Sequence, residues 1–174
     1  YKSIYYFQLS ADQNNSKAQY ILGMIYYEGK FITRDIDKSK HYFQLSADQN
    51  NSDAQYILGF IYYEGKYVSQ NIDKAIYYFQ LSADQNNSNA QFFLGVIYYE
   101  GKFIARDIDK SIHYFQFSAD QNNANAKSYL SKNYFQDGNV ENNFKKSIYL
   151  ISVLAKHNHP HAQFIIGMAH LNGQ

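Results

Sequence analysis

The chain has 174 residues, and its 16 Lys and Arg stand against 15 Asp and Glu for a net charge of +1. This balance provides no positive surplus for nucleic acid or an anionic membrane. Cysteine is absent, which excludes disulfides and thiolate chemistry and mildly favours a cytoplasmic protein. The apolar runs are too short to span a bilayer. We therefore expect no nucleic-acid partner and no membrane insertion.

One polar phrase, ADQNN, occurs four times at intervals of 36 residues. Its copies stand at 11–15, 47–51, 83–87 and 119–123. Three further motifs keep the same period: LG first at 22–23, YYEGK first at 26–30 and IDK first at 36–38. A period of this length is typical of repeat proteins, in which each unit is one supersecondary element.

The first predicted element is a helix at Tyr1–Gln13, followed by units of two helices each. In the best-defined unit, apolar residues at helical spacing predict a first helix at Ser52–Glu64 and a second at Ile72–Gln85. The many aromatic and β-branched residues could also suggest strands, but the 3–4 spacing and the paired start and stop signals favour helices. The last predicted element is a first helix at His161–Asn172.

Start and stop signals recur at the same points of each unit. Gly65 stands where a left-handed residue can end the first helix. A column of Asp and Asn stands where the second helix should begin, each able to accept a hydrogen bond from free backbone N–H groups. This N-cap column consists of Asp35, Asn71, Asp107 and Asn143.

The ADQNN phrase could be a recurring ligand loop, but we interpret it as the joint between units. Ala47 should pack inside the array. Asn50 should adopt the left-handed conformation that ends a helix, and Asn51 should cap the next helix, which leaves Ser52 in its first turn. Asn86 and Asn122 should also have positive φ. Pro160, in the fifth copy, stands at the first helical position, which proline favours.

The predicted organisation is one array over residues 1–174. It comprises an unpaired second helix at 1–15, full units at 16–51, 52–87, 88–123 and 124–159, and a further first helix at 160–174. This gives about ten helices. The fourth unit is degenerate, with Ser131 and Asn133 at positions that are glycine and apolar elsewhere, so we expect distortion there. Neither end shows a polar capping helix, so we expect a segment of a longer array.

The recurring residues resemble the Sel-one-like repeat (SLR) family, a relative of the tetratricopeptide repeats. In the second unit the shared motif is carried by Ala54, Leu58-Gly59, Tyr62 and Gly65, then by Lys74-Ala75, Tyr78, Ala83 and Ala90. The resemblance covers essentially the whole chain, although Phe31, Tyr67 and Phe103 replace a loop glycine. It implies an all-α, right-handed superhelix of antiparallel helix pairs that holds other proteins together.

Small and aromatic columns are expected to form the interior. Gly23, Gly59, Gly95 and Gly167 should permit close approach of a neighbouring helix to the first helices. The aromatic residues of the second helices should be core, with the tyrosine hydroxyls reaching polar partners or water. These are Tyr42, Tyr78, Tyr114, Phe43, Phe79 and Phe115.

A second aromatic set lies on the first helices, which line the concave surface in related arrays. A groove rich in tyrosine suits peptide or helix recognition, because tyrosine gives contact area at low entropic cost. The alternative is that half of these side chains simply pack between adjacent repeats. The candidate protein-binding residues are Tyr20, Met24, Tyr27, Tyr56, Phe60, Tyr63, Phe92, Val96, Tyr99 and Phe164.

Other candidate sites are explained better by the repeat. His157, His159 and His161 could ligate a metal, but they occupy a joint and have no acidic or sulfur ligand beside them. Asp35 with Asp37, and Asp107 with Asp109, open helices, where negative charge is favoured. We therefore predict no catalytic residues, no metal and no cofactor.

The sequence predicts a non-catalytic scaffold or adaptor that binds a partner protein through its concave face. One alternative is a structural part of a large cytoskeletal or membrane-associated assembly. Another is the regulatory arm of a multidomain enzyme such as a kinase.

Overall fold

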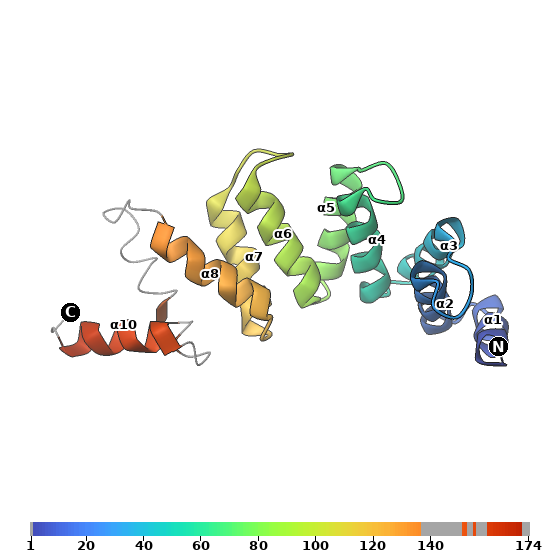
Figure 1. Ribbon diagram of the computed structural model, residues 1–174, viewed down its shortest axis with the longest axis horizontal. Coiled ribbons are helices and arrows are strands. Elements are labelled where there is room, and N and C mark those ends of the chain that lie inside the picture. Colours follow the sequence, from blue (N-terminus) through green and yellow to red (C-terminus); the bar gives the residue numbers. More distant parts are fainter. Residues whose placement is uncertain (1, 137–150, 153–154, 156–159, 172–174) are drawn as a thin grey trace.

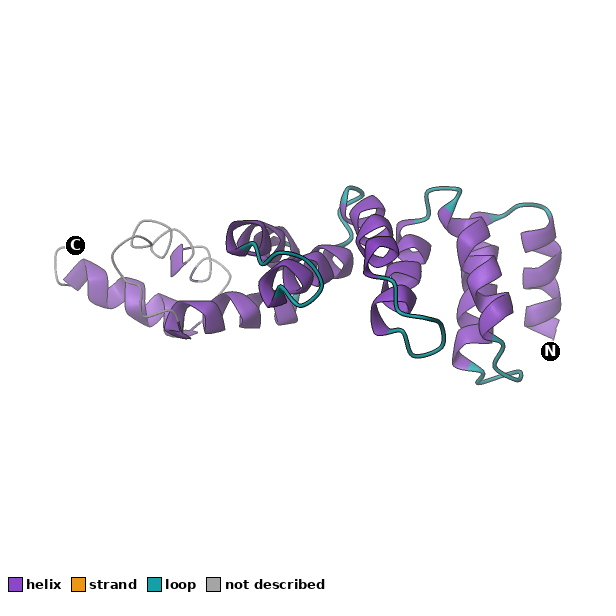
Figure 2. Cartoon of the chain, turned by 90° about the horizontal axis from the view of Figure 1, so that it is seen from above, coloured by secondary structure: helices purple, strands orange, loops and turns teal. Residues whose placement is uncertain are grey.

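The computed structural model describes residues 2–136, 151–152, 155 and 160–171. The described residues form helices joined by short loops, as Figure 2 shows, and within these ranges there is no strand. Successive helices pack against each other in chain order, so that antiparallel pairs stack along one long axis with the termini at opposite ends (Figure 1). This confirms the predicted all-α solenoid of antiparallel helix pairs.

Nine helices lie within the described residues. They are α1 (Lys2–Asp12), α2 (Ser16–Glu28), α3 (Ile36–Ala47), α4 (Ser52–Glu64), α5 (Ile72–Ala83), α6 (Ser88–Glu100), α7 (Ile108–Asp120), α8 (Ala124–Gln136) and α10 (Pro160–Leu171). The first helix of the second unit has the predicted bounds. The second helix of that unit ends at Ala83 instead of the predicted Gln85, because the chain turns toward Asn86, which has φ 62°.

The predicted caps form wherever the structure describes them. The side chains of Asp35, Asn71 and Asp107 accept hydrogen bonds from the backbone N–H of the residue three positions on, at 3.0, 2.9 and 2.9 Å. Gly65 ends α4 with φ 65°. Asn143, the fourth member of this column, and most of the second helix of the fourth unit lie outside the described residues.

The joints between repeats are helix corners, as predicted. Asn50, Asn86 and Asn122 have φ of 60°, 62° and 67°. Asn51 Oδ1 accepts from the N–H of Ala54 at 3.0 Å, so α4 begins at Ser52. Pro160 is the first residue of α10. The ADQNN phrase therefore ends one helix and starts the next.

In the repeats at 16–51, 52–87 and 88–123, a glycine of the first helix packs against a phenylalanine ring of the second helix. Phe43, Phe79 and Phe115 are fully buried. A Cβ placed on Gly59 would lie 2.6 Å from Phe79 Cδ1, and the glycines 36 residues before and after it face their rings at the same distance. The predicted close approach is confirmed, and it is made by a side-chain ring. Gly167 differs, since a Cβ there would meet none of the described residues within 4 Å.

A ladder of polar contacts recurs every 36 residues; the sequence predicted that its tyrosine hydroxyls reach polar partners but did not predict its glutamine and serine bonds. Gln85 Nε2 donates to Gln55 Oε1 on the first helix of the same repeat at 2.7 Å, and Gln55 itself is 1% exposed. Ser82 Oγ donates to the carbonyl of Ser52 at 2.7 Å, and Tyr78 Oη donates to Gln44 Oε1 at 2.7 Å. Equivalent bonds recur one repeat later at Gln121, Ser118 and Tyr114. The glutamine and serine bonds thus link the two helices of one repeat, and the tyrosine bonds link each repeat to the preceding one.

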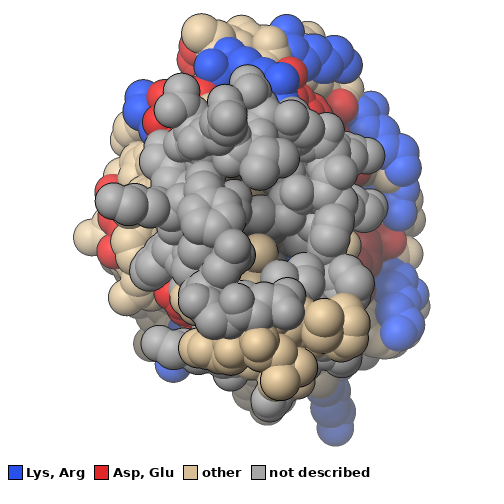
Figure 3. Space-filling model, turned by 90° about the vertical axis from the view of Figure 1, so that its left-hand side faces the viewer, with Lys and Arg blue, Asp and Glu red and all other residues tan. Residues whose placement is uncertain are grey.

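Charged side chains lie at the rim of the array. In the view from the end that carries α8 and α10, Lys and Arg side chains lie next to Asp and Glu side chains around the margin (Figure 3). Among the described residues there are two ion pairs, Lys38 with Asp35 at 3.7 Å and Lys110 with Asp107 at 3.6 Å. Both are exposed pairs within one helix turn and add little to stability.

Candidate protein-binding face

Aromatic side chains of the first helices gather on one side of the array, which we call the first-helix aromatic face. Its residues are Tyr20, Met24 and Tyr27 of α2, Tyr56, Phe60 and Tyr63 of α4, Phe92 and Tyr99 of α6, and two that the sequence analysis did not select, Phe93 of α6 and Tyr129 of α8. All of them are partly buried and pack against the core clusters. They are thus neither free surface residues nor interior residues.

Ring contacts connect this face from repeat to repeat. Phe93 is the central member: its ring centroid lies 6.1 Å from that of Tyr56, 5.4 Å from Phe60 and 5.5 Å from Tyr63. Tyr129 continues the contacts into α8, 5.5 Å from Phe92 and 6.0 Å from Tyr99. These rings therefore pack between adjacent repeats, as the alternative interpretation of the sequence expected, and keep part of their surface exposed. Their role in binding a partner stays a prediction.

Two selected residues lie elsewhere. Val96 is 5% exposed and belongs to the core cluster of Phe115 and Leu130. It cannot line an exposed groove, which corrects its assignment: a β-branched aliphatic at that position is short enough to be covered by the rings around it. Phe164 lies on α10 and is 62% exposed.

The tyrosine hydroxyls of the face differ from those of the second helices. Tyr78 and Tyr114 donate to glutamine side chains of the preceding repeat. Within the described residues, Tyr20, Tyr56 and Tyr63 have no such partner. Burial, with a smaller effect of nearby carboxylates, raises the pKa of all three phenols above 10.0. Their hydroxyls are therefore neutral donors available to a ligand at neutral pH.

The sequence did not reveal Phe93 and Tyr129 as members of the face. Phe93 replaces Ile21 and Ile57 of the preceding repeats, and this change from aliphatic to aromatic was the available signal. Tyr129 lies in the degenerate fourth unit, whose sequence resembles the other repeats least.

The remaining candidates are the histidines near residue 160 and the paired aspartates that open second helices. Among the described residues, no group of three or more His, Asp or Glu is placed to hold a metal ion. His157 and His159 lie outside the described residues. Asp37 and Asp109 open α3 and α7 in the first turn, as the repeat predicted. In the part of the chain that the structure covers, no helix is both long and apolar enough to cross a bilayer.

The fold and its repeated joints define a class, the solenoids built from helix-pair repeats of 36 residues. The chain belongs to the Sel1 repeat family, whose model matches residues 1–15, 16–51, 52–87, 88–123 and 160–174. The unit predicted at 124–159 is not among these matches and stays a prediction. A search of curated proteins gave no match.

Solved structures with this fold include three bacterial proteins. One is a protective antigen present in uropathogenic Escherichia coli strains and displaying an SLR fold, with 32% identity, a TM-score of 0.76, and coverage of 98% of this chain and 37% of that one. Another is a Sel1 repeat protein from Oxalobacter formigenes, with 25% identity, a TM-score of 0.76, and coverage of 99% and 71%. The third, Helicobacter pylori cysteine rich protein B, shares 19% identity with a TM-score of 0.56 over 71% of this chain and 93% of that one.

Proposed function

We propose that the chain is a non-catalytic scaffold that binds a partner protein through the first-helix aromatic face. The observation that carries the proposal is the set of half-buried tyrosines whose hydroxyls make no hydrogen bond within the described residues. Rings held by their neighbours lose little entropy when a partner covers them, and each hydroxyl supplies a donor for a partner's polar group.

The face also has the right composition for recognition. Aromatic residues are enriched where protein interfaces concentrate their binding energy. The rings form a chain of contacts that continues from α4 through α6 to α8, so a partner segment laid across the repeats would meet aromatic surface in each of them. Family membership supports a scaffold role, because every match to the family model is a repeat unit.

The test uses the full chain and its purified partner. Tyr56→Ala with Tyr63→Ala should weaken partner binding by about tenfold or more, as expected for loss of two central aromatic anchors. Tyr62→Ala is the matched control, because Tyr62 is the chain neighbour of Tyr63 but stacks on Tyr78 of the second helix, with centroids 6.0 Å apart. Tyr56→Phe with Tyr63→Phe separates the hydroxyls from the rings.

Photo-crosslinking identifies the contacted face independently of affinity. A crosslinker placed at Phe60 should capture the partner, and one placed at Asp73 on the exposed side of α5 should not. Equal capture from both positions would contradict the aromatic face and favour an array held by many surfaces of a large assembly. Hydrolase or kinase activity of the purified chain would contradict the non-catalytic assignment.

A cytoplasmic location forms part of the proposal and rests on the absence of cysteine. The relative described as a protective antigen points instead to exposure outside the cell. Cell fractionation with antibodies against the chain decides between the two locations.

A further inference from the structure

Two pockets open at successive joints between repeats, and they are built from the same eight positions 36 residues apart. The pocket beside α3, α4 and α5 has a volume of about 260 Å³, and the pocket beside α5, α6 and α7 about 280 Å³. The first is lined by Gln44, Ala47, Asp48, Asn50, Gln55, Tyr77, Tyr78 and Leu81. The second is lined by Gln80, Ala83, Asp84, Asn86, Gln91, His113, Tyr114 and Phe117. We call these two cavities the joint pockets.

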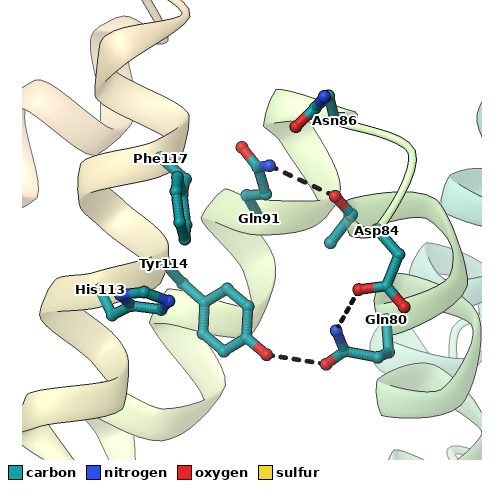
Figure 4. Close-up of a pocket in the computed structure, with 8 residues that line it drawn as sticks. Gln80, Asp84, Asn86, Gln91, His113, Tyr114 and Phe117 are labelled. Carbon is teal, nitrogen blue, oxygen red and sulfur yellow. Dashed lines mark hydrogen bonds between the residues drawn. The ribbon is translucent and has the colours of Figure 1, made fainter.

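The floor of each joint pocket is a chain of hydrogen bonds that ends on a carboxylate. In the second pocket Tyr114 Oη donates to Gln80 Oε1 at 2.7 Å, and Gln80 Nε2 donates to Asp84 Oδ1 at 2.7 Å (Figure 4). The first pocket repeats the chain from Tyr78 through Gln44 to Asp48 at the same two distances. Because each glutamine is fixed at both ends of its amide, the carboxylate is held in one orientation.

Exposed aromatic rings form the outer wall. His113 and Phe117 meet edge to face with centroids 4.5 Å apart, and both project from α7 beside Tyr114 (Figure 4). In the first pocket Tyr77 meets Tyr78 edge to face at 5.1 Å. Tyr77 is 57% exposed and Phe117 is 46% exposed, so these rings cover little of their own chain.

Within the described residues, neither carboxylate forms an ion pair with a lysine or arginine. Residues 75–101, which contain Asp84, include no Lys or Arg, and the same holds for residues 41–65 around Asp48. The two ion pairs found among the described residues lie at the opposite ends of the second helices. Burial is the main cause that raises the pKa of the Tyr114 phenol, and the negative charge of Asp84 adds to it.

The next joint of the same chain shows a cation at this place. Lys127 stands where the earlier repeats have Gln55 and Gln91. Its Nζ donates to Oδ1 of Asn122, the left-handed asparagine of that joint, at 2.8 Å. An ammonium group on an alkyl chain is therefore accommodated beside this corner when the chain itself supplies one.

We propose that the two joint pockets bind lysine or arginine side chains from one basic segment of a partner protein. The charged group would lie at the carboxylate of Asp48 or Asp84, and its aliphatic stem and cationic head would contact the ring wall, where cation–π attraction adds to the ion pair. Because the pockets recur along the array, a segment with two basic residues occupies both. This surface is distinct from the first-helix aromatic face and does not depend on it.

The proposal is tested with acetylated and amidated glycine-serine peptides that carry one arginine, or two arginines at increasing separations. Binding to the full chain is measured by isothermal titration calorimetry at low and at physiological salt. At the best separation the two-arginine peptide should bind about tenfold or more tightly than the one-arginine peptide, because the second contact becomes intramolecular. Affinity should fall with added salt, since both carboxylates are exposed.

Variants locate the binding. Asp84→Asn keeps an oxygen that accepts from Gln80 but removes the charge, so it should reduce the two-arginine peptide to the affinity of the one-arginine peptide. Asp73→Asn, an equal charge change in the first turn of α5 at the other end of the repeat, should have no effect. Gln91→Lys should also abolish the two-site gain by placing an ammonium in the pocket as Lys127 does.

Four results would overturn the proposal. They are an absence of peptide binding at millimolar concentration, equal affinity of one- and two-arginine peptides, equal loss in Asp84→Asn and Asp73→Asn, or undiminished binding to Gln91→Lys. Spermidine is tested as a free small cation. If it binds as tightly as the two-arginine peptide, the pockets bind small cations, and the proposal of a basic partner segment is refuted. Loss of peptide binding in Tyr56→Ala with Tyr63→Ala would place the peptide on the aromatic face instead.

Discussion

Replacing Gly59 by alanine should destabilise the array, although alanine is the better helix former. The new Cβ would lie 2.6 Å from Cδ1 and 2.8 Å from Cε1 of Phe79. The ring cannot withdraw, because it is fully buried and stacks on Phe93 with centroids 5.3 Å apart. The substitution thus sets helix propensity against core packing at a single position.

Helix propensity and core packing contribute to the free energy of unfolding in opposite directions, and their magnitudes differ enough to decide whether the substitution stabilises or destabilises the chain. Removing glycine from a helix interior stabilises by about 1 kcal/mol. Adding a methyl group to a closed core costs about 1–3 kcal/mol, and the enclosed ring places Gly59 at the upper end. We expect net destabilisation of about 1–2 kcal/mol for Gly59→Ala, and more for Gly59→Val, whose branched side chain adds volume and forfeits most of the propensity gain.

Urea unfolding followed by circular dichroism measures the effect. For a chain of this size, each kcal/mol lowers the melting temperature by about 2–4 °C. Gly167→Ala is the matched control, because none of the described residues lies within 4 Å of its Cβ and the propensity gain should dominate. Gly59→Ala combined with Phe79→Leu should recover part of the loss. An alanine variant as stable as the parent chain would refute the packing account.

Three further predictions concern the joints, the buried polar groups and the tyrosines. Asn50→Ala should cost about 1 kcal/mol in thermal unfolding because φ is 60°, while Asn50→Gly should be tolerated. Ser39→Ala should cost about 1 kcal/mol by losing a 2.9 Å hydrogen bond to a carbonyl, but Ser111→Ala should be neutral, because the buried Ser111 Oγ has no partner among the described residues. If both variants lose equal stability, that assignment is wrong. Above about pH 10 the urea midpoint should fall. The pKa values of Tyr56 and Tyr63 are raised in the folded chain, so these phenols ionise at a lower pH in the unfolded chain, which is then favoured. Tyr56→Phe with Tyr63→Phe should make the decline shallower.

Local backbone chemistry made the corners predictable from sequence. Asn50 stands at a helix stop where few residues tolerate positive φ, and Asn51 is followed by a helix whose first N–H groups require an acceptor. Both constraints act within four residues, so the sequence alone specifies them. The repeat then extends one inference to every equivalent joint.

Contacts between distant residues were harder to predict. Gln55 looks like a surface residue in the sequence, and its burial depends on Gln85, which lies 30 residues away. Likewise, nothing near Val96 in the sequence shows that the surrounding rings cover it while its equivalent Phe60 stays partly exposed. These outcomes depend on contacts between helices that are distant in the sequence, which the local pattern does not record.

The repeated polar ladder has a consequence for the evolution of the array. The Tyr78–Gln44 and Tyr114–Gln80 bonds join different pairs of repeats through the same atoms, both at 2.7 Å. If residues 52–87 were deleted, Asn51 would precede Ser88, and the new junction would read as the old one does. Whole units can therefore be lost or duplicated without a new interface having to arise. The length of such an array can change in steps of 36 residues while every interface between repeats keeps the same hydrogen bonds.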